Sequence, residues 1–259
     1  MFPFYFGSAN KHIYGVHHEA SGDEYRDEAI LFCCPVSHEY MRTHWFLKLL
    51  CEKLSSRGYH CLRFDYYGTG DSSGSFLDAD IDEWIQNVVA ASDEIKELSG
   101  CTRVSMIGVR LGAMLSALAS EVVKPERVVL WDPVVDGQVY LSELEMLHEE
   151  MIQDRSRFKH LPASNDEEIH QILGYQYNDN LFNSIANKKF GLSKIRANQI
   201  SVVTGKNNHT VLKNNKDKQP VNISYIDSNV ESDWLYLDNM EKMFFSDRLS
   251  DVIVDLFIE

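Results

Sequence analysis

Apolar runs of strand length alternate with helical stripes of apolar residues along most of the chain. The runs are short, continuous and bounded by polar or glycine-containing segments, which is typical of strands buried on both faces of a parallel sheet. They lie at residues 29–36, 59–64, 103–109, 127–137, 198–205 and 221–227. Apolar residues recurring at intervals of three and four predict helices in the segments 47–54, 81–89, 111–123 and 249–257. This alternation predicts an α/β fold, a mostly parallel central sheet with helices on both faces.

The alternation is interrupted between about residues 138 and 195. Four apolar residues form one helical stripe there: Leu141, Leu144, Leu147 and Met151. A polar stretch rich in Asn and Asp follows, and this combination is typical of a helical segment inserted over a sheet. We therefore expect a single domain over residues 1–259, with a mostly helical, lid-like insertion above the carboxyl ends of the strands.

Composition and charge exclude several classes of function. The chain has 259 residues, of which 44% are hydrophobic, and its formal net charge of −14 would repel a phosphate backbone, so nucleic acid is not expected as a partner. No apolar run approaches the roughly 20 residues that span a bilayer, and the first residues lack the pattern of a signal peptide, which predicts a cytoplasmic protein. The five cysteines lie in apolar runs without metal-ligand spacing, so we expect buried thiols, no disulfide, no metal and no other cofactor.

Two glycine-containing segments follow predicted strands, where chemistry gathers in a parallel sheet. The segment "DYYGTGDSSG" at 65–74 predicts a tight turn in which Asp65 and Ser72 brace the backbone. The segment "GVRLG" at 108–112 has the outline of a nucleophile elbow, a sharp turn between a strand and a helix that exposes one side chain. At its centre, where a nucleophile is expected, stands Arg110.

These segments together resemble the α/β-hydrolase superfamily over nearly the whole chain. The first is similar to the D-x-x-G-x-G-x-S loop of lipase, esterase and aminopeptidase-like branches, and the second stands where the G-x-S-x-G elbow belongs. More narrowly, "HEYMRTH", "FDYYGTGDS", "GVRLGA" and "LWDPVVDG" resemble the hydrolase-like proteins associated with exosortase and exopolysaccharide loci. That narrower resemblance implies an arginine at the elbow.

A hydrolase of this superfamily needs a nucleophile, an acid and a histidine, in that chain order. Arg110 replaces the nucleophile, and its guanidinium has no free lone pair with which to attack a carbonyl. No histidine follows His209, so the loop after the last strand lacks the usual base. Asp132 and Asp136 are candidates for the acid. The sequence therefore excludes hydrolysis by the usual covalent route.

Arg110 has two interpretations at this stage. As a cation at a helix N-terminus, it could hold the carboxylate or phosphate of a ligand in two hydrogen bonds. Alternatively, it pairs inside the protein with one of four carboxylates: Glu39, Asp65, Asp132 or Asp136. The residues expected around a ligand at the elbow, besides Arg110 itself, are Ser37, His38, Glu39, Tyr66, Val109 and Leu111.

The sequence predicts a catalytically degenerate α/β-hydrolase-fold protein that binds an acyl or anionic small molecule, or acts as a scaffold or regulator. A protein partner or a homo-oligomer would suit the second role. The alternative is a hydrolase, thioesterase or acyltransferase of polysaccharide or lipid metabolism with an unusual catalytic arrangement. In that case we expect His38, with Asp132 or Asp136, to activate a water molecule.

Overall fold

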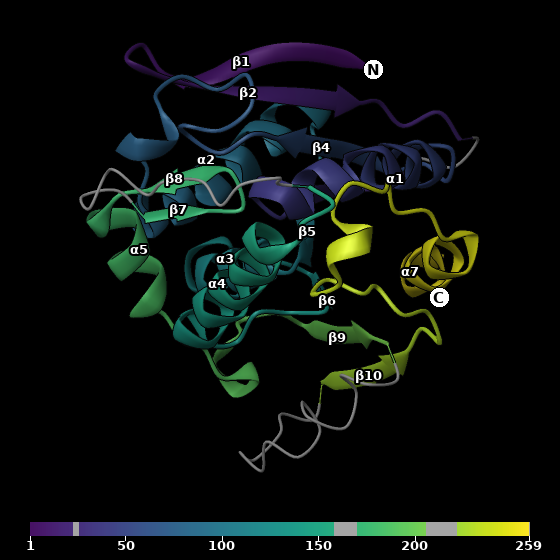
Figure 1. Ribbon diagram of the computed structural model, residues 1–259. Coiled ribbons are helices and arrows are strands. Elements are labelled where there is room, and N and C mark those ends of the chain that lie inside the picture. The colour runs from purple at the N-terminus through teal and green to yellow at the C-terminus, as the bar shows by residue number, and fades with distance from the viewer. Residues whose placement is uncertain (23–25, 158–169, 206–221, 259) are drawn as a thin grey trace.

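An eight-stranded sheet forms the centre of the computed structural model, which describes residues 1–22, 26–157, 170–205 and 222–258. Its strands are β1 (Phe2–Ser8), β2 (Lys11–His18), β3 (Glu28–Cys33), β4 (His60–Phe64), β5 (Arg103–Val109), β6 (Arg127–Trp131), β9 (Gln199–Thr204) and β10 (Ile223–Asp227). Their order across the sheet is β1-β2-β4-β3-β5-β6-β9-β10 (Figure 1). Every neighbouring pair from β4 to β10 is parallel, whereas β1 and β2 are antiparallel to their neighbours. The predicted mostly parallel sheet is confirmed.

Helices cover both faces of this sheet because each presents an apolar stripe to it. They are α1 (Ser37–Ser55), α2 (Ile81–Ser99), α3 (Leu111–Val123) and α7 (Asp247–Ile258). On one face, α1 and α7 share a buried core to which they contribute Leu50 and Ile253. On the other face, α2 and α3 contribute Trp84 and Met114 to a separate core. All five cysteines are buried and none forms a disulfide.

The insertion between β6 and β9 contains strands as well as helices. It holds α4 (Gly137–Gln153), a hairpin of β7 (His170–Ile172) and β8 (Tyr175–Tyr177), and α5 (Asp179–Ala186). The expectation of a mostly helical insertion missed the hairpin, because three-residue strands leave too short a pattern to recognise. Residues 158–169 of the insertion and the lysine-containing loop after β9 lie outside the described residues.

Two predicted strands end earlier than their apolar runs. The run at 29–36 is strand only as far as Cys33, since Pro35 cannot donate to a sheet. The run at 127–137 is strand only as far as Trp131. Asp132 then adopts a positive φ of 42°, and Asp136 caps α4 by accepting from two backbone N–H groups. Apolar runs indicate the strands but not the turns that end them.

The N-terminal hairpin of β1 and β2 extends the sheet beyond the predicted strands. The apolar run at residues 2–6 was not recognised as a strand, and polar residues interrupt the pattern of β2, which joins the hairpin to β4. At this junction His17 Nε2 lies 3.1 Å from His60 Nδ1. Arg63 Nη2 lies 3.3 Å from His18 Nε2, which accepts a hydrogen bond only while that nitrogen is unprotonated.

We expect acid to destabilise this junction as the pH falls from about 6.5 to about 4. Burial, assisted by the charge of Arg63, lowers the pKa of His18 to about 4, and burial also lowers the pKa of His17. Because the folded pKa values lie below the unfolded ones, the unfolded chain binds protons first and stability is lost as pH falls. For His18 the shift corresponds to about 3 kcal/mol of unfolding free energy.

Urea unfolding at pH 7, 5.5 and 4 measures this loss, and the variant His18→Gln is the control. Glutamine keeps an acceptor for Arg63 but does not titrate. We expect the variant to lose less stability than the wild type over the same pH range. Identical pH profiles for the two proteins would contradict a role for His18.

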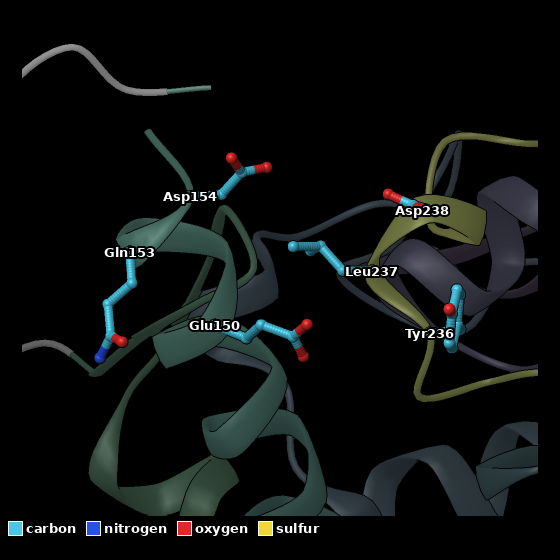
Figure 2. A pocket seen from close by; sticks show the side chains of 6 residues that line it. All are labelled: Glu150, Gln153, Asp154, Tyr236, Leu237 and Asp238. Atoms are coloured by element: carbon cyan, nitrogen blue, oxygen red, sulfur yellow. The ribbon is translucent and has the colours of Figure 1, made fainter. Parts of the chain in front are cut away.

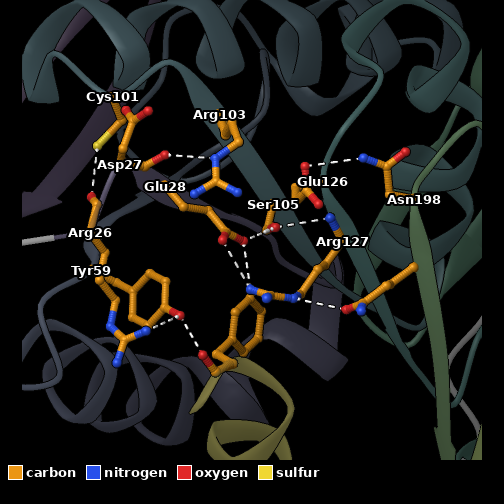
Figure 3. A network of polar contacts seen from close by, with 12 residues as sticks. Arg26, Asp27, Glu28, Tyr59, Cys101, Arg103, Ser105, Glu126, Arg127 and Asn198 are labelled. Carbon is orange, nitrogen blue, oxygen red and sulfur yellow. Dashed lines mark hydrogen bonds and ion pairs between the residues drawn. The ribbon is translucent and has the colours of Figure 1, made fainter. Parts of the chain in front are cut away.

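A polar network joins the amino ends of three strands, at the end of the sheet away from the elbow (Figure 3). Glu28 on β3 accepts from Arg127 on β6 at 2.9 Å and from the hydroxyl of Ser105 on β5. The Ser105 hydroxyl in turn accepts from the backbone N–H of Arg127 at 3.0 Å. Both oxygens of the buried Glu28 carboxylate have donors, so the network has a structural role in the register of the sheet.

Candidate functional site

The turn between β5 and α3 has the geometry of a nucleophile elbow. Arg110, at its apex, has φ of 52° and ψ of −119°, a conformation that non-glycine residues rarely adopt. Two glycines allow the close approach of strand and helix. A Cβ on Gly112 would lie 2.1 Å from the carbonyl oxygen of Cys33, and one on Gly108 would lie 2.5 Å from Ser116 Oγ. The pattern G-x-R-x-G therefore keeps the backbone that the fold uses to present a nucleophile.

The Arg110 guanidinium is paired inside the protein. Its Nε donates to Glu39 Oε1 at 2.7 Å, and its Nη2 lies 3.4 Å from Glu143 Oε2 on α4. Its Nη1 lies 3.5 Å from the backbone carbonyl oxygen of Asp132. Arg110 is 7% exposed and Glu39 is fully buried, so the ion pair between them is shielded from water.

Tyr140 completes this cluster from the first turn of α4. Its hydroxyl donates to Glu39 Oε2 at 3.1 Å, so both oxygens of the buried carboxylate are satisfied. Burial opposes the charge of Arg110, but Glu39, together with Tyr140 and Glu143, outweighs burial and raises the arginine pKa above its usual range. Burial and the Glu39 charge also raise the pKa of Tyr140. The arginine is therefore charged and the tyrosine neutral at physiological pH.

Trp234, in the loop after β10, lies against the elbow. Its indole N–H donates to Asp132 Oδ2 at 2.8 Å, and the Arg110 guanidinium lies 5.4 Å from the centre of its ring. In this fold the histidine belongs on the loop after the last strand and donates to the acid. Arg110, Asp132 and Trp234 follow one another along the chain in the order of nucleophile, acid and histidine.

Ser37 and His38 stand at the start of α1, near the elbow. No described hydrogen bond joins His38 to Asp132 or Asp136, the acids expected beside it. His38 is 5% exposed, and neither ring nitrogen has a hydrogen-bond partner among the described residues. Burial lowers its pKa, although Glu39 acts in the opposite direction, so its imidazole is neutral at pH 7. Ser37 Oγ lies 3.1 Å from the hydroxyl of Tyr177 in the insertion.

Other residues predicted for the site lie elsewhere. Asp136, predicted as a candidate acid, pairs with Lys189 at 2.7 Å and caps α4, and no described contact joins it to Arg110. Val109 and Leu111 have fully buried side chains in the two cores on either side of the sheet. The Tyr66 hydroxyl donates to the Cys34 carbonyl beneath the elbow.

Asp65 has the bracing role predicted for it and does not pair with Arg110. Its Oδ2 accepts from the backbone N–H of Asp71 at 3.0 Å, and its backbone carbonyl accepts from Ser72 Oγ at 2.6 Å. Tyr40 donates to the remaining oxygen at 3.1 Å. Burial raises the pKa of this carboxyl.

A cavity of about 250 Å³ opens beside Arg110, and we call it the elbow cavity. The described residues that line it are Arg110, Asp132, Glu143, Gly205, Glu231, Ser232, Asp233, Trp234, Leu235 and Tyr236. It lies at the carboxyl ends of the strands, where this class of fold binds small molecules. Among the described residues no group of three or more His, Cys, Asp or Glu is placed to hold a metal ion. No helix within those residues is both long and apolar enough to cross a membrane.

The fold and the elbow together define the class of protein, an α/β hydrolase, as the sequence motifs predict. The family profile described as serine aminopeptidase, S33, matches residues 30–202, which is most of the chain. The chain belongs to this family. No curated protein sequence matches it.

Solved structures that resemble the chain share its fold over its whole length. Est1E from Butyrivibrio proteoclasticus, with ferulic acid bound, is 16% identical, with 98% of each chain covered and a TM-score of 0.67. The α/β hydrolase domain-containing protein 10 from mouse is 16% identical, with 100% of this chain and 99% of that one covered and a TM-score of 0.62. At these identities the likeness shows the fold alone.

Three residues of the site were not predicted. Glu143 and Tyr140 come from α4, and their spacing of three shows only that they share a helix face, not that this face reaches the elbow. The sequence position of Trp234 could have indicated its place at the site, because Trp234 follows the last strand, where the histidine of a triad is expected.

Proposed function

We propose that this protein binds a small molecule at its elbow and does not hydrolyse it. The observation that carries the proposal is the buried pair of Arg110 and Glu39, which occupies the position of a nucleophile. A charged guanidinium donates hydrogen bonds but has no lone pair for attack. The side chain expected to start the usual reaction is thus a structural cation.

The residue at the position expected for the triad's histidine supports the same conclusion. Trp234 makes the hydrogen bond to Asp132 that the histidine of a triad makes to its acid. An indole nitrogen, however, only donates, so it cannot take a proton from a nucleophile or return one to a leaving group. The proposed elbow therefore keeps the arrangement of a triad without its proton transfers. An arginine at this position also agrees with the narrower resemblance to exosortase- and exopolysaccharide-associated proteins.

The contacts of Arg110 argue against the anionic ligand expected from the sequence. Among the described residues of the elbow cavity, Arg110 is the one cation, and Glu39 and Glu143 already accept from it. An acyl group, a protein partner, a second copy of the chain and a cytoplasmic location stay as predictions from the sequence.

A second candidate function rests on His38. Its two ring nitrogens have no partner among the described residues, and its lowered pKa leaves it neutral and able to act as a base at pH 7. With Asp132 it would activate water in a hydrolase, thioesterase or acyltransferase of polysaccharide or lipid metabolism. No described contact links His38 to Asp132, so we favour the binding function.

Turnover of p-nitrophenyl acetate, p-nitrophenyl butyrate and acetyl thioesters distinguishes the two candidates. We expect the wild type and His38→Ala to show the same rate as buffer, because neither has an activated nucleophile. His38→Ala is also the control for contaminating esterases, because a contaminant would give the same turnover in both preparations. Wild-type turnover that disappears in His38→Ala would overturn the binding function in favour of the enzyme.

A further inference from the structure

Three large apolar side chains are exposed in a row along the outer face of α1. They are Met41, Trp45 and Leu49, which are four residues apart, so they form one ridge about 12 Å long on the helix surface. Leu47 and Leu50, on the inner face of the helix, are buried in the core that α1 shares with α7. The helix therefore has a second apolar stripe, which the described part of the chain leaves exposed.

Met243 and Phe245, in the loop after β10, extend this exposed surface beyond α1. They flank Phe244, whose ring centre lies 5.2 Å from that of Phe46 on α1. The backbone N–H of Phe244 donates to the carbonyl oxygen of Arg42 at 2.8 Å, so this part of the loop lies directly beside α1. The five exposed side chains, which we call the α1 patch, are Met41, Trp45, Leu49, Met243 and Phe245.

The loop that supplies the last two residues of the patch is anchored to α1 and to the segment after α4. Arg42 on α1 donates to the backbone carbonyl of Ser232 at 3.0 Å, and Arg157 pairs with Glu241. Figure 2 shows residues 236–238 of the same loop facing the end of α4 across a cavity of about 390 Å³. The exposure of the apolar side chains on this loop is therefore part of the folded structure.

The size of the α1 patch fits one half of a dimer interface. Its side chains are between 41% and 62% exposed, which amounts to about 500 Å² at roughly 200 Å² for a large apolar side chain. A standard interface takes about 800 Å² from each partner, and about 65% of a homodimer interface is apolar, which is again about 500 Å². Four of the five residues are Met, Trp or Phe, the types that interfaces favour.

The charges around the α1 patch permit contact between two copies of this acidic chain. The net charge of −14 makes two copies repel one another in general. At the patch, however, Lys48 pairs with Glu52 at 3.2 Å, and Lys242 and Asp247, which flank the loop segment, have opposite charges. These charges at the rim cancel, so two patches can meet without bringing an excess of acids together. An anionic lipid surface would instead repel the chain as a whole.

We propose that the α1 patch is the contact surface of a homodimer, in which two copies of the chain pack α1 against α1 around a twofold axis. Such an axis brings the same surface of both copies together, so each patch covers the other. The ridge formed by Met41, Trp45 and Leu49 is of the kind that packs into the groove of a facing helix. This inference is independent of what the elbow binds.

Sedimentation equilibrium of the full chain, from about 1 to 100 μM in about 150 mM NaCl, tests the homodimer. We expect the measured mass to reach twice that of one chain at the upper end of this range. A chain that stays monomeric over the whole range would overturn the proposal.

Two matched variants locate the interface. Leu49→Glu changes a residue of the patch that is 46% exposed, and Leu98→Glu changes a residue of α2 that is 43% exposed. Both replace the same side chain on a helix surface and add one negative charge. We expect Leu49→Glu to raise the dissociation constant of the dimer at least tenfold, because the twofold axis brings two copies of the new charge into one interface. The constant for Leu98→Glu should stay within twofold of that of the wild type.

A third variant, Phe245→Glu, tests the loop part of the patch and should weaken the dimer as Leu49→Glu does. Circular dichroism establishes that each variant folds. A dimer that is unaffected by both patch variants, or weakened equally by Leu49→Glu and Leu98→Glu, would overturn the proposed surface. Flotation with phosphatidylcholine vesicles tests the other occupant. A monomer that floats with these vesicles, and no longer does so after Leu49→Glu, would assign the patch to a lipid surface and overturn the homodimer.

Discussion

Replacing Arg110 with serine is expected to lower the free energy of unfolding by about 3 to 5 kcal/mol, without producing an esterase. The loss arises because Glu39 is fully buried and would keep only the hydrogen bond from Tyr140. For a chain of this size the change corresponds to a fall of about 10 °C in Tm. The new hydroxyl stays unreactive, because Trp234 cannot accept its proton.

A double variant distinguishes the contribution of the ion pair to stability from the general effect of changing the residue at the elbow. Arg110→Met with Glu39→Gln removes both charges, keeps an acceptor for Tyr140 and fills most of the volume. Replacing both members of a buried pair is often neutral, so we expect this variant to recover most of the lost stability. Scanning calorimetry of the three proteins gives the comparison. If Arg110→Ser is as stable as the wild type, the arginine does not neutralise a buried carboxylate.

The second large effect is a gain of activity when the triad is rebuilt. The variant combining Arg110→Ser, Glu39→Gln and Trp234→His places a hydroxyl at the elbow and an imidazole in the loop that contacts Asp132. The indole of Trp234 already donates to Asp132 at 2.8 Å, so the acid stands ready to orient an imidazole. We expect turnover of p-nitrophenyl acetate about 100-fold above that of the same variant without Trp234→His.

The matched double variant Arg110→Ser with Glu39→Gln controls for the rebuilt triad, since it has the hydroxyl but no base. Circular dichroism and calorimetry establish that both variants fold. Equal turnover by the two folded variants would show that position 234 is not the position of the triad's histidine.

The sequence was informative about the sheet and the elbow, because both depend on local pattern. Continuous apolar runs indicated six of the eight strands of the main sheet, and "GVRLG" located the turn at which Arg110 stands. Glu39 was among the four carboxylates considered as its partner. Polar residues interrupt β2 and hid that strand, whereas the apolar run of β1 at residues 2–6 was not recognised as a strand.

What the sequence could not provide were contacts between distant elements. Glu143 and Tyr140 reach Arg110 because α4 docks over the elbow, and no local pattern encodes that docking. Asp136 was a reasonable acid by position, but the chain turns at Asp132 and places it at the start of α4 instead. The choice between a free and a paired arginine depended on these tertiary contacts.

Labelling with a fluorophosphonate probe tests most directly whether the elbow of this protein lacks an activated nucleophile. Such a probe attaches covalently to a serine only when a base withdraws its proton. Intact-protein mass spectrometry should show no adduct on the wild type, whereas the variant with Arg110→Ser, Glu39→Gln and Trp234→His should gain one. A stoichiometric adduct on any single serine of the wild type would contradict the proposed loss of hydrolytic chemistry.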